Sequence, residues 1–254
     1  MAVSRVVTGW WLVSMACAAL VQAQGTSSEN DQLALSILKR ADEVRFPGEG
    51  FEVAVSIKTT SEGEVTDRHA YRVLSKGNEN TIVMITEPAS ERGQIMLMKS
   101  RDLWLFLPNI SQPVRLSLAQ RLTGQVANGD IARANFVGDY VPHLEGTEKI
   151  GDETYYVLDL RAADRGVTYQ RVRYWVRQRN AWPYKAEFYS LSDRLLKTCI
   201  YGDFKEAGGR VRPMQLVMTD ALRKTEESTM VYSNMKTRDL PDKIFTKDYL
   251  KKLE

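Results

Sequence analysis

The sequence predicts a mainly β protein of the α+β class. A single curled antiparallel sheet should form an incomplete, half-open barrel that is wrapped around, or closed by, a few helices. Segments in which apolar and polar residues alternate recur along most of the chain, which is typical of strands with one buried face. Neither an internal repeat nor a low-complexity linker divides the 254 residues. A sheet of about ten or eleven strands must curl, split or close.

The first predicted element of the folded part is an amphipathic helix. Ser28 and Asp31 resemble a helix N-terminus, and Pro47 and Gly48 end the pattern. The apolar residues at spacings of three and four between them are Ala34, Ile37, Leu38, Ala41 and Val44. Strands are predicted at residues 51–58, 68–74, 80–86, 93–99 and 102–108, and then at 153–160, 169–177, 183–190, 195–204, 212–220 and 224–235. Thr246 is expected to cap a short last helix.

Two of these strands are apolar on both faces. Residues 95–98 are Ile-Met-Leu-Met and residues 103–107 are similarly apolar, whereas a sheet with one face in water should alternate. Either helices or a ligand should therefore cover the second face, and the methionines favour an adaptable surface, because Met fills irregular shapes. Residues 111–144 follow without strand alternation. We interpret them as loop with short helices at 116–122 and 130–136, and as a candidate lid.

The first 23 residues have the pattern of a cleavable secretory signal peptide. Arg5 precedes an apolar run that ends in Val-Gln-Ala at residues 21–23, a small-residue cleavage site. The run is too short to span a bilayer comfortably, and polar residues follow it at once. We therefore expect a mature protein that begins near Gln24, a periplasmic location and a single domain over residues 24–254.

The two cysteines, Cys17 and Cys199, lie on opposite sides of the predicted cleavage site. Lipoprotein anchoring through an acylated Cys17 is the weaker alternative, because the residues before it match a lipobox poorly and apolar residues follow it. Removal of the signal peptide leaves Cys199 as the single cysteine, so no intramolecular disulfide is expected. On a predicted strand, Cys199 should be a small buried hydrophobe.

Composition and motifs argue against several classes of function. The formal net charge of +3 is small and the basic residues are scattered, so no basic stripe indicates nucleic acid. The histidines His69 and His143 stand in no pairing motif, and the sequence lacks a phosphate-binding glycine loop, a nucleophile elbow and a zinc-binding helix. Two histidines and one mature cysteine are too few for a typical zinc site. We therefore expect no enzyme, no metal and no cofactor.

Three groups of side chains leave alternatives open. Four carboxylates could converge without a linear signature, although solvated charges, caps and turn residues are the better interpretation; they are Asp130, Asp139, Glu145 and Asp159. Aromatic residues are concentrated on the strands, where most should be core and some could line an apolar cavity. Arg171, Arg173 and Arg177 share one strand face with Trp175, and a wet outer face is favoured there over a site for anionic headgroups.

Several motifs occur in a characteristic order after the signal peptide, the helix and the first strands. They are the segment from Asp102 to Pro108, the pair Gly129-Asp130, the strand Tyr155-Tyr156-Val157-Leu158 and the strand Arg173-Tyr174-Trp175-Val176. This order resembles the LolA-like family of outer membrane lipoprotein-sorting proteins over nearly the whole mature chain. It is most similar to an uncharacterised branch, with Phe106 in place of the usual Tyr and with Arg115 and Arg121 as the basic residues. Residues 127–134 lack the acidic end of the usual family segment.

The resemblance implies a periplasmic carrier or binding protein for the acyl chains of lipoproteins or other lipids, in outer membrane lipoprotein sorting or lipid transport. Each acyl CH₂ removed from water contributes about 0.8 kcal/mol, so a shielding cavity suffices to carry a lipid. The candidate cavity residues are Met96, Met98, Trp104, Phe106 and Tyr174. An inner-membrane RND-type exporter or an ABC-type release complex is the expected partner. The alternative is a lipoprotein-sensing or partner-binding module that acts with a membrane regulator or an RND-type exporter.

Overall fold

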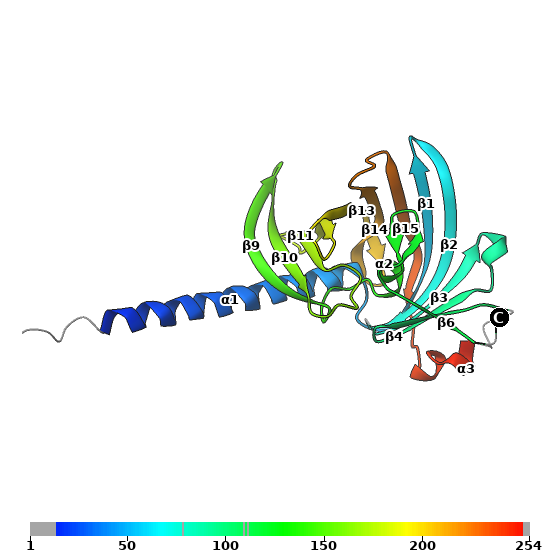
Figure 1. Cartoon of the computed structure of the whole chain (residues 1–254), viewed down its shortest axis with the longest axis horizontal. Coiled ribbons are helices and arrows are strands. Elements are labelled where there is room, and N and C mark those ends of the chain that lie inside the picture. Colours follow the sequence, from blue (N-terminus) through cyan, green and yellow to red (C-terminus); the bar gives the residue numbers. More distant parts are fainter. Residues whose placement is uncertain (1–13, 78, 109, 111, 251–254) are drawn as a thin grey trace, which may run out of the picture.

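One antiparallel sheet of 13 strands forms the body of the protein and confirms the predicted fold class (Figure 1). The computed structural model describes residues 14–250 except 78, 109 and 111, with side chains from residue 29. In spatial order the strands are β6 (Val114–Leu116), β5 (Asp102–Phe106), β4 (Ile95–Lys99), β3 (Asn80–Glu87), β2 (Glu64–Lys76), β1 (Phe51–Ser61), β15 (Glu226–Thr237), β14 (Arg210–Asp220), β13 (Leu195–Ala207), β12 (Pro183–Tyr189), β11 (Arg171–Arg177), β10 (Glu153–Ala162) and β9 (Tyr140–Ile150). Two meanders, β1 to β6 and β9 to β15, are therefore joined where β1 pairs with β15.

The sheet curls without closing into a barrel, because β6 and β9 are its two edges. A separate two-stranded hairpin consists of β7 (Arg121–Thr123) and β8 (Val126–Ala127). The residues on the concave side form the main hydrophobic core, and Cys199 on β13 is buried there as predicted.

Helix α1 (Ser14–Arg45) enters this concave side and projects from the body at its N-terminal end (Figure 1). It begins earlier than the predicted Ser28, because the preceding residues include Ala and Leu, which favour a helix. The predicted apolar positions Ala34, Ile37, Leu38 and Ala41 are fully buried. Among the residues that the structure describes, no helix has both the length and the apolar character to cross a membrane. The predicted signal peptide lies outside the described residues for positions 1–13.

Both faces of the apolar strand β4 are covered. Met96 and Met98 belong to the concave core, whereas Ile95 and Leu97 pack on the other face. That face is covered by the C-terminal segment, which contains η2 (Asp242–Ile244) and α3 (Lys247–Leu250) and packs through Leu240, Ile244, Phe245 and Leu250. Helices rather than a ligand therefore cover the second face of β4, which is one of the two alternatives predicted from its apolar sequence. Thr246 directly precedes α3 as expected, and its carbonyl accepts the N–H groups of Tyr249 and Leu250, but its hydroxyl donates to the Lys243 carbonyl rather than capping the helix.

The region after β5 differs from its predicted structure. Residues 116–122 are not helical, because Leu116 pairs with Leu103 of β5 and Arg121 pairs with Ala127. A short helix, α2 (Asn128–Ala132), does form close to the predicted second helix. Strand β9 then begins at Tyr140, so the candidate lid of residues 111–144 ends inside the sheet, and its first residue lies outside the described part.

Candidate functional site

A short internal segment fills the concave side of the sheet. It comprises α2 and the residues that follow it, and we call residues 128–137 the plug. Ile131, Ala132 and Phe136 of the plug belong to the same hydrophobic cluster as Val53 of β1 and Met218 of β14. The plug belongs to none of the strands of the large sheet. The apolar interior of the half-barrel is thus closed by a piece of chain that is not a strand of the sheet and makes β pairing only in the isolated bridge of Val137 with Tyr140.

Asp42 of α1 binds one end of the plug. Its Oδ2 accepts hydrogen bonds from the backbone N–H groups of Phe136, at 2.8 Å, and Val137, at 2.7 Å. The side chain is buried, and Arg45 Nη1 lies 3.4 Å from Oδ1. Burial raises the pKa of Asp42 to about 6, although Arg45 and the two N–H groups oppose this shift. One buried carboxylate therefore joins α1 to the plug.

Arg45 places a second charge in the same part of the interior. Its guanidinium carbon lies 4.5 Å from the centroid of the Phe136 ring and 5.6 Å from that of Tyr201. A cation over an aromatic face is attracted by the ring, more strongly when both are desolvated. Phe136 is therefore held both by its backbone, through Asp42, and by its ring, through Arg45.

Asp130 binds the other end of the plug to the sheet. Its Oδ2 lies 2.6 Å from Lys197 Nζ, and the Tyr169 hydroxyl donates to it at 2.8 Å. It also accepts the N–H of Ala127 at 2.8 Å, just before α2 begins. Burial, followed by the nearby Asp130 carboxylate, raises the pKa of Tyr169 well above its ordinary value, so this hydroxyl stays protonated and donates. Lys197 is buried and also donates to the Gln125 carbonyl at 2.6 Å.

Arg133 forms a third attachment in the middle of the plug. Its guanidinium makes two hydrogen bonds with Asp139, at 2.5 and 2.8 Å, and a third with the Ser100 carbonyl at 2.7 Å. Arg101 also binds Asp139, at 3.2 Å. Charged and backbone groups thus attach the plug at both ends and in the middle, while its apolar side chains fill the interior.

Little free space remains beside the plug. One cavity of about 20 Å³ lies between Ile131 and Ala132 of the plug and Val53 and Val55 of β1. A second, also of about 20 Å³, lies between Asp130 and Phe136 on one side and Met218 on the other. A cavity needs roughly 10–15 Å³ of such volume for one water. In this conformation the interior has room for single waters and not for an acyl chain.

The five predicted cavity residues divide between the two faces of the sheet. Met96, Met98 and Tyr174 are buried in the concave core, where the Tyr174 ring meets Phe136 edge-on at 5.2 Å. Phe106 packs with the C-terminal segment, and Lys247 of that segment lies 5.4 Å from the centroid of the Trp104 ring. None of the five lines either small cavity. Their assignment as ligand contacts stays a prediction.

Sequence reasoning missed Asp42 and Arg45. A signal was present, because both residues follow apolar helix positions by four residues, Leu38 and Ala41 respectively, and so lie on the apolar face. Charged residues on such a face require partners in the interior. The helix at 130–136 was predicted close to α2, but its contribution of Ile131 and Ala132 to the concave core was not, since two residues are too few to show a clear periodicity.

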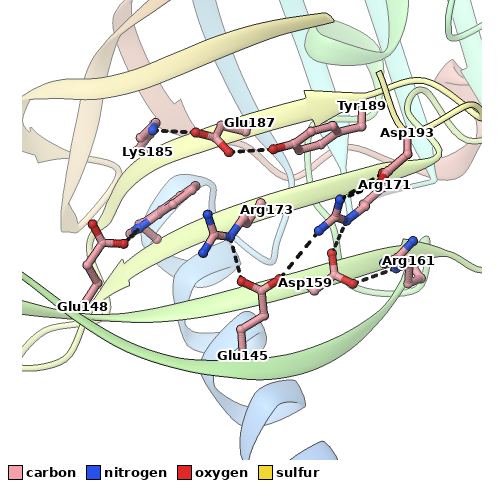
Figure 2. A network of polar contacts seen from close by, with 11 residues as sticks. Glu145, Glu148, Asp159, Arg161, Arg171, Arg173, Lys185, Glu187, Tyr189 and Asp193 are labelled. Carbon is pink, nitrogen blue, oxygen red and sulfur yellow. Dashed lines mark hydrogen bonds and ion pairs between the residues drawn. The ribbon is translucent and has the colours of Figure 1, made fainter. Parts of the chain in front are cut away.

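Arg171 and Arg173 of β11 lie on an outer face where basic and acidic side chains pair with each other (Figure 2). Arg171 is bound by Asp159 at 2.5 Å and by Asp193 at 2.9 Å, and Arg173 is bound by Glu145 at 2.6 Å. The same face carries Lys185 paired with Glu187, whose second oxygen accepts the Tyr189 hydroxyl. Because carboxylates already neutralise the guanidinium groups, this face fits the interpretation of a wet outer surface better than that of a headgroup site.

The four carboxylates considered for catalysis each bind a basic side chain. Asp130 pairs with Lys197, Asp139 with Arg133, Glu145 with Arg173 and Asp159 with Arg171. Within the described part of the chain, no three His, Cys, Asp or Glu residues are grouped so that they could hold a metal ion.

Fold and interior together define a class of protein: an open antiparallel half-barrel whose apolar inside is closed by a segment of its own chain. A family model described as an uncharacterized protein matches residues 77–252. The crystal structure of the LolA superfamily protein NE2245 from Nitrosomonas europaea is similar, with 63% identity, a TM-score of 0.82, and coverage of 85% of this chain and 98% of that one. This chain therefore belongs to the LolA superfamily.

Two more distant structures share the fold. A DUF1329 family protein from Desulfovibrio piger is 21% identical, with a TM-score of 0.75 and coverage of 87% of this chain and 99% of that one. A protein domain from Vibrio parahaemolyticus, named for outer membrane lipoprotein sorting, is 19% identical, with a TM-score of 0.75 and coverage of 87% and 100%. A comparison with curated proteins finds no match.

Proposed function

We propose that this protein is a periplasmic carrier or binding protein for the acyl chains of lipoproteins or other lipids, and that it is not an enzyme. The observation that carries the proposal is the plug, an apolar segment that occupies the interior of an open half-barrel and is attached through a few polar groups. Membership of the LolA superfamily supports the same function.

The volume of the interior determines how such a carrier loads. Each of the two cavities beside the plug measures about 20 Å³, so an acyl chain and the plug cannot occupy the interior together. Displacement of the plug leaves apolar side chains of β1 and β14 for the cargo to cover. Each buried CH₂ contributes about 0.8 kcal/mol, so a long chain can compensate for the contacts that the plug gives up. Loading is therefore an exchange of one apolar occupant for another.

We also propose that the protein works in the periplasm and exchanges its cargo with a membrane protein. The signal-peptide pattern of residues 1–23 supports secretion to the periplasm, where a lipid needs shielding from water. Carriers of this kind must receive and release their cargo at membranes. An inner-membrane RND-type exporter or an ABC-type release complex is the partner class that we propose for this step.

Uptake of an acyl probe by protein purified without detergent tests the proposal. We expect saturable binding of a fluorescent fatty acid, and faster binding by Asp42→Ala, because alanine offers no oxygen to the Phe136 and Val137 N–H groups. Glu43→Ala is the matched control, since Glu43 is adjacent on α1 but exposed and pairs with Arg210. It should bind the probe at the wild-type rate.

Two other results would change the conclusion. Protein that carries no lipid after purification and takes up no acyl probe would contradict the proposal. Probe binding without transfer from a membrane to a soluble acceptor would favour the alternative, a module that senses a lipoprotein for a membrane regulator.

A further inference from the structure

A larger cavity lies at one end of the sheet, outside the apolar interior. It has a volume of about 250 Å³, against about 20 Å³ for each cavity beside the plug. Its walls are the β7–β8 hairpin, the beginning of β13 and the end of β14 with the turn that follows. The hairpin leads directly into the plug, so this cavity lies at the edge of the region that must move during loading.

The charges that line this cavity are mainly positive. Three basic residues, Arg121, Arg194 and Lys197, face one acidic residue, Asp220. Lys197 is already bound to Asp130, and the Asp220 carboxylate accepts the N–H groups of Leu222 and Arg223, at 2.8 Å each. Arg121 and Arg194 are exposed and come from separate elements, the hairpin and the β12–β13 turn.

These two arginines differ from those on the outer face. Within the described part of the chain, neither the Arg121 nor the Arg194 side chain makes a hydrogen bond or an ion pair, and Arg121 has only a weaker electrostatic interaction with Asp220. Arg171 and Arg173, by contrast, are both bound by carboxylates. Guanidinium groups bind phosphate oxygens in pairs, and two of them can contact one tetrahedral anion from different sides.

Apolar groups continue from this cavity towards the interior. Leu195, Leu196 and Leu222 line it, and Leu222 is 77% exposed at its mouth. Tyr169 lines both this cavity and the small one beside Asp130. The Asp130–Lys197–Tyr169 contacts therefore lie between a basic mouth and an apolar interior. This arrangement matches an amphiphile with an anionic head and an apolar tail.

We propose that the cavity is a subsite for a phosphate-type anion, bound by Arg121 and Arg194. A lipid headgroup as the source of the phosphate rests on the proposed function, whereas free phosphate offers the same chemistry without it. The double variant Arg121→Ser/Arg194→Ser tests the site. Arg40→Ser/Arg68→Ser is the matched control, because it removes the same charge from exposed arginines outside the cavity.

Three probes separate the outcomes: phosphatidylglycerol with a fluorescent acyl chain, diacylglycerol with the same chain, and inorganic phosphate. We expect the double variant to bind phosphatidylglycerol about tenfold more weakly than wild type, with diacylglycerol binding unchanged. The control variant should bind all three probes like wild type. Thermal unfolding and the single variants Arg121→Ser and Arg194→Ser distinguish loss of the site from loss of the fold.

Two further outcomes distinguish failure of the subsite from failure of the carrier function. Binding of inorganic phosphate that requires both arginines, without binding of either lipid, would support the subsite with free phosphate as its ligand while the carrier function fails. Equal affinity of wild type and double variant for phosphatidylglycerol and for phosphate would overturn the subsite. If diacylglycerol still bound in that case, the carrier function would stand.

Discussion

At the scale of single residues, the closed interior depends on buried charges whose partners come from the plug. Asp42 and Lys197 are 5% and 4% exposed, and each uses a charged group to hold a segment distant in sequence. Burying a charge is costly unless it is paired and hydrogen-bonded. The cost is tolerable here because Asp42 accepts hydrogen bonds from two backbone N–H groups and Lys197 forms an ion pair with a carboxylate. Detaching the plug would leave both ions without these partners, so water or cargo must replace them.

The raised pKa of Asp42 predicts a specific dependence of stability on pH. Burial raises this pKa from 3.8 to about 6, so between these values the folded state binds more protons than the unfolded state. The stability contribution is thus fully present below pH 4 and is lost as pH rises through 6. Lowering the pH from 7 to 5 should raise the free energy of unfolding of wild type relative to Asp42→Asn by about 1 kcal/mol.

Urea unfolding at the two pH values measures this difference. Glu43→Gln is the control here, because removal of an exposed carboxylate should leave the pH dependence close to that of wild type. A pH dependence that is the same in wild type and Asp42→Asn would show that Asp42 stays ionised in the folded protein down to pH 5.

At the scale of elements, the C-terminal segment explains why β4 is apolar on both faces. Phe245 is 1% exposed and packs with Ile82 of β3 and Leu97 of β4. We expect Phe245→Ala to lower the free energy of unfolding by about 3–5 kcal/mol, because a large buried ring is removed and leaves a cavity. Chemical denaturation measures the loss, and the exposed Lys243→Ala in the same segment is the control, expected within about 0.5 kcal/mol of wild type. A small effect of Phe245→Ala would mean that the segment covers β4 only loosely.

Elements with strong local patterns could be predicted from the sequence, and those set by distant contacts could not. The double-faced apolar pattern of residues 95–98 correctly required a cover on both sides, and Pro47 and Gly48 correctly marked the end of α1. Strand β9 was missed because it is an edge strand in which Pro142 and Gly146 interrupt the alternation of apolar and polar residues. The plug lies within the predicted candidate lid of residues 111–144, but its attachment to Asp42 could not be predicted, because that contact spans 94 residues to Phe136. The periodicity of apolar residues along a segment shows which face of that segment is buried, but not which distant residue it contacts.

At the scale of the whole molecule, the half-barrel combines a stable sheet with a closing segment of lower expected stability. Strands β13 and β14 pair over most of their length, from Lys197 with Asp220 to Ala207 with Arg210. The plug has no such ladder: the contacts of Asp42, Asp130 and Arg133 hold it, together with two backbone hydrogen bonds from Asn128 and Gly129 to residues 118–120. Segments held by few backbone pairs open locally at lower free energy than central strands. The architecture therefore allows the interior to open while the sheet stays folded.

Hydrogen exchange during loading provides the test at this scale. Binding of a fluorescent fatty acid should speed amide exchange at Phe136 and Val137, because cargo displaces the plug and their N–H groups lose the Asp42 carboxylate. Amides of β13 and β14 should be unaffected, since their hydrogen bonds belong to the central sheet. Mass spectrometry of peptides from the loaded and empty protein measures both regions. Saturable probe binding with slower exchange across residues 128–137 would show instead that cargo binds with the plug in place, and the interior would not be the cargo site.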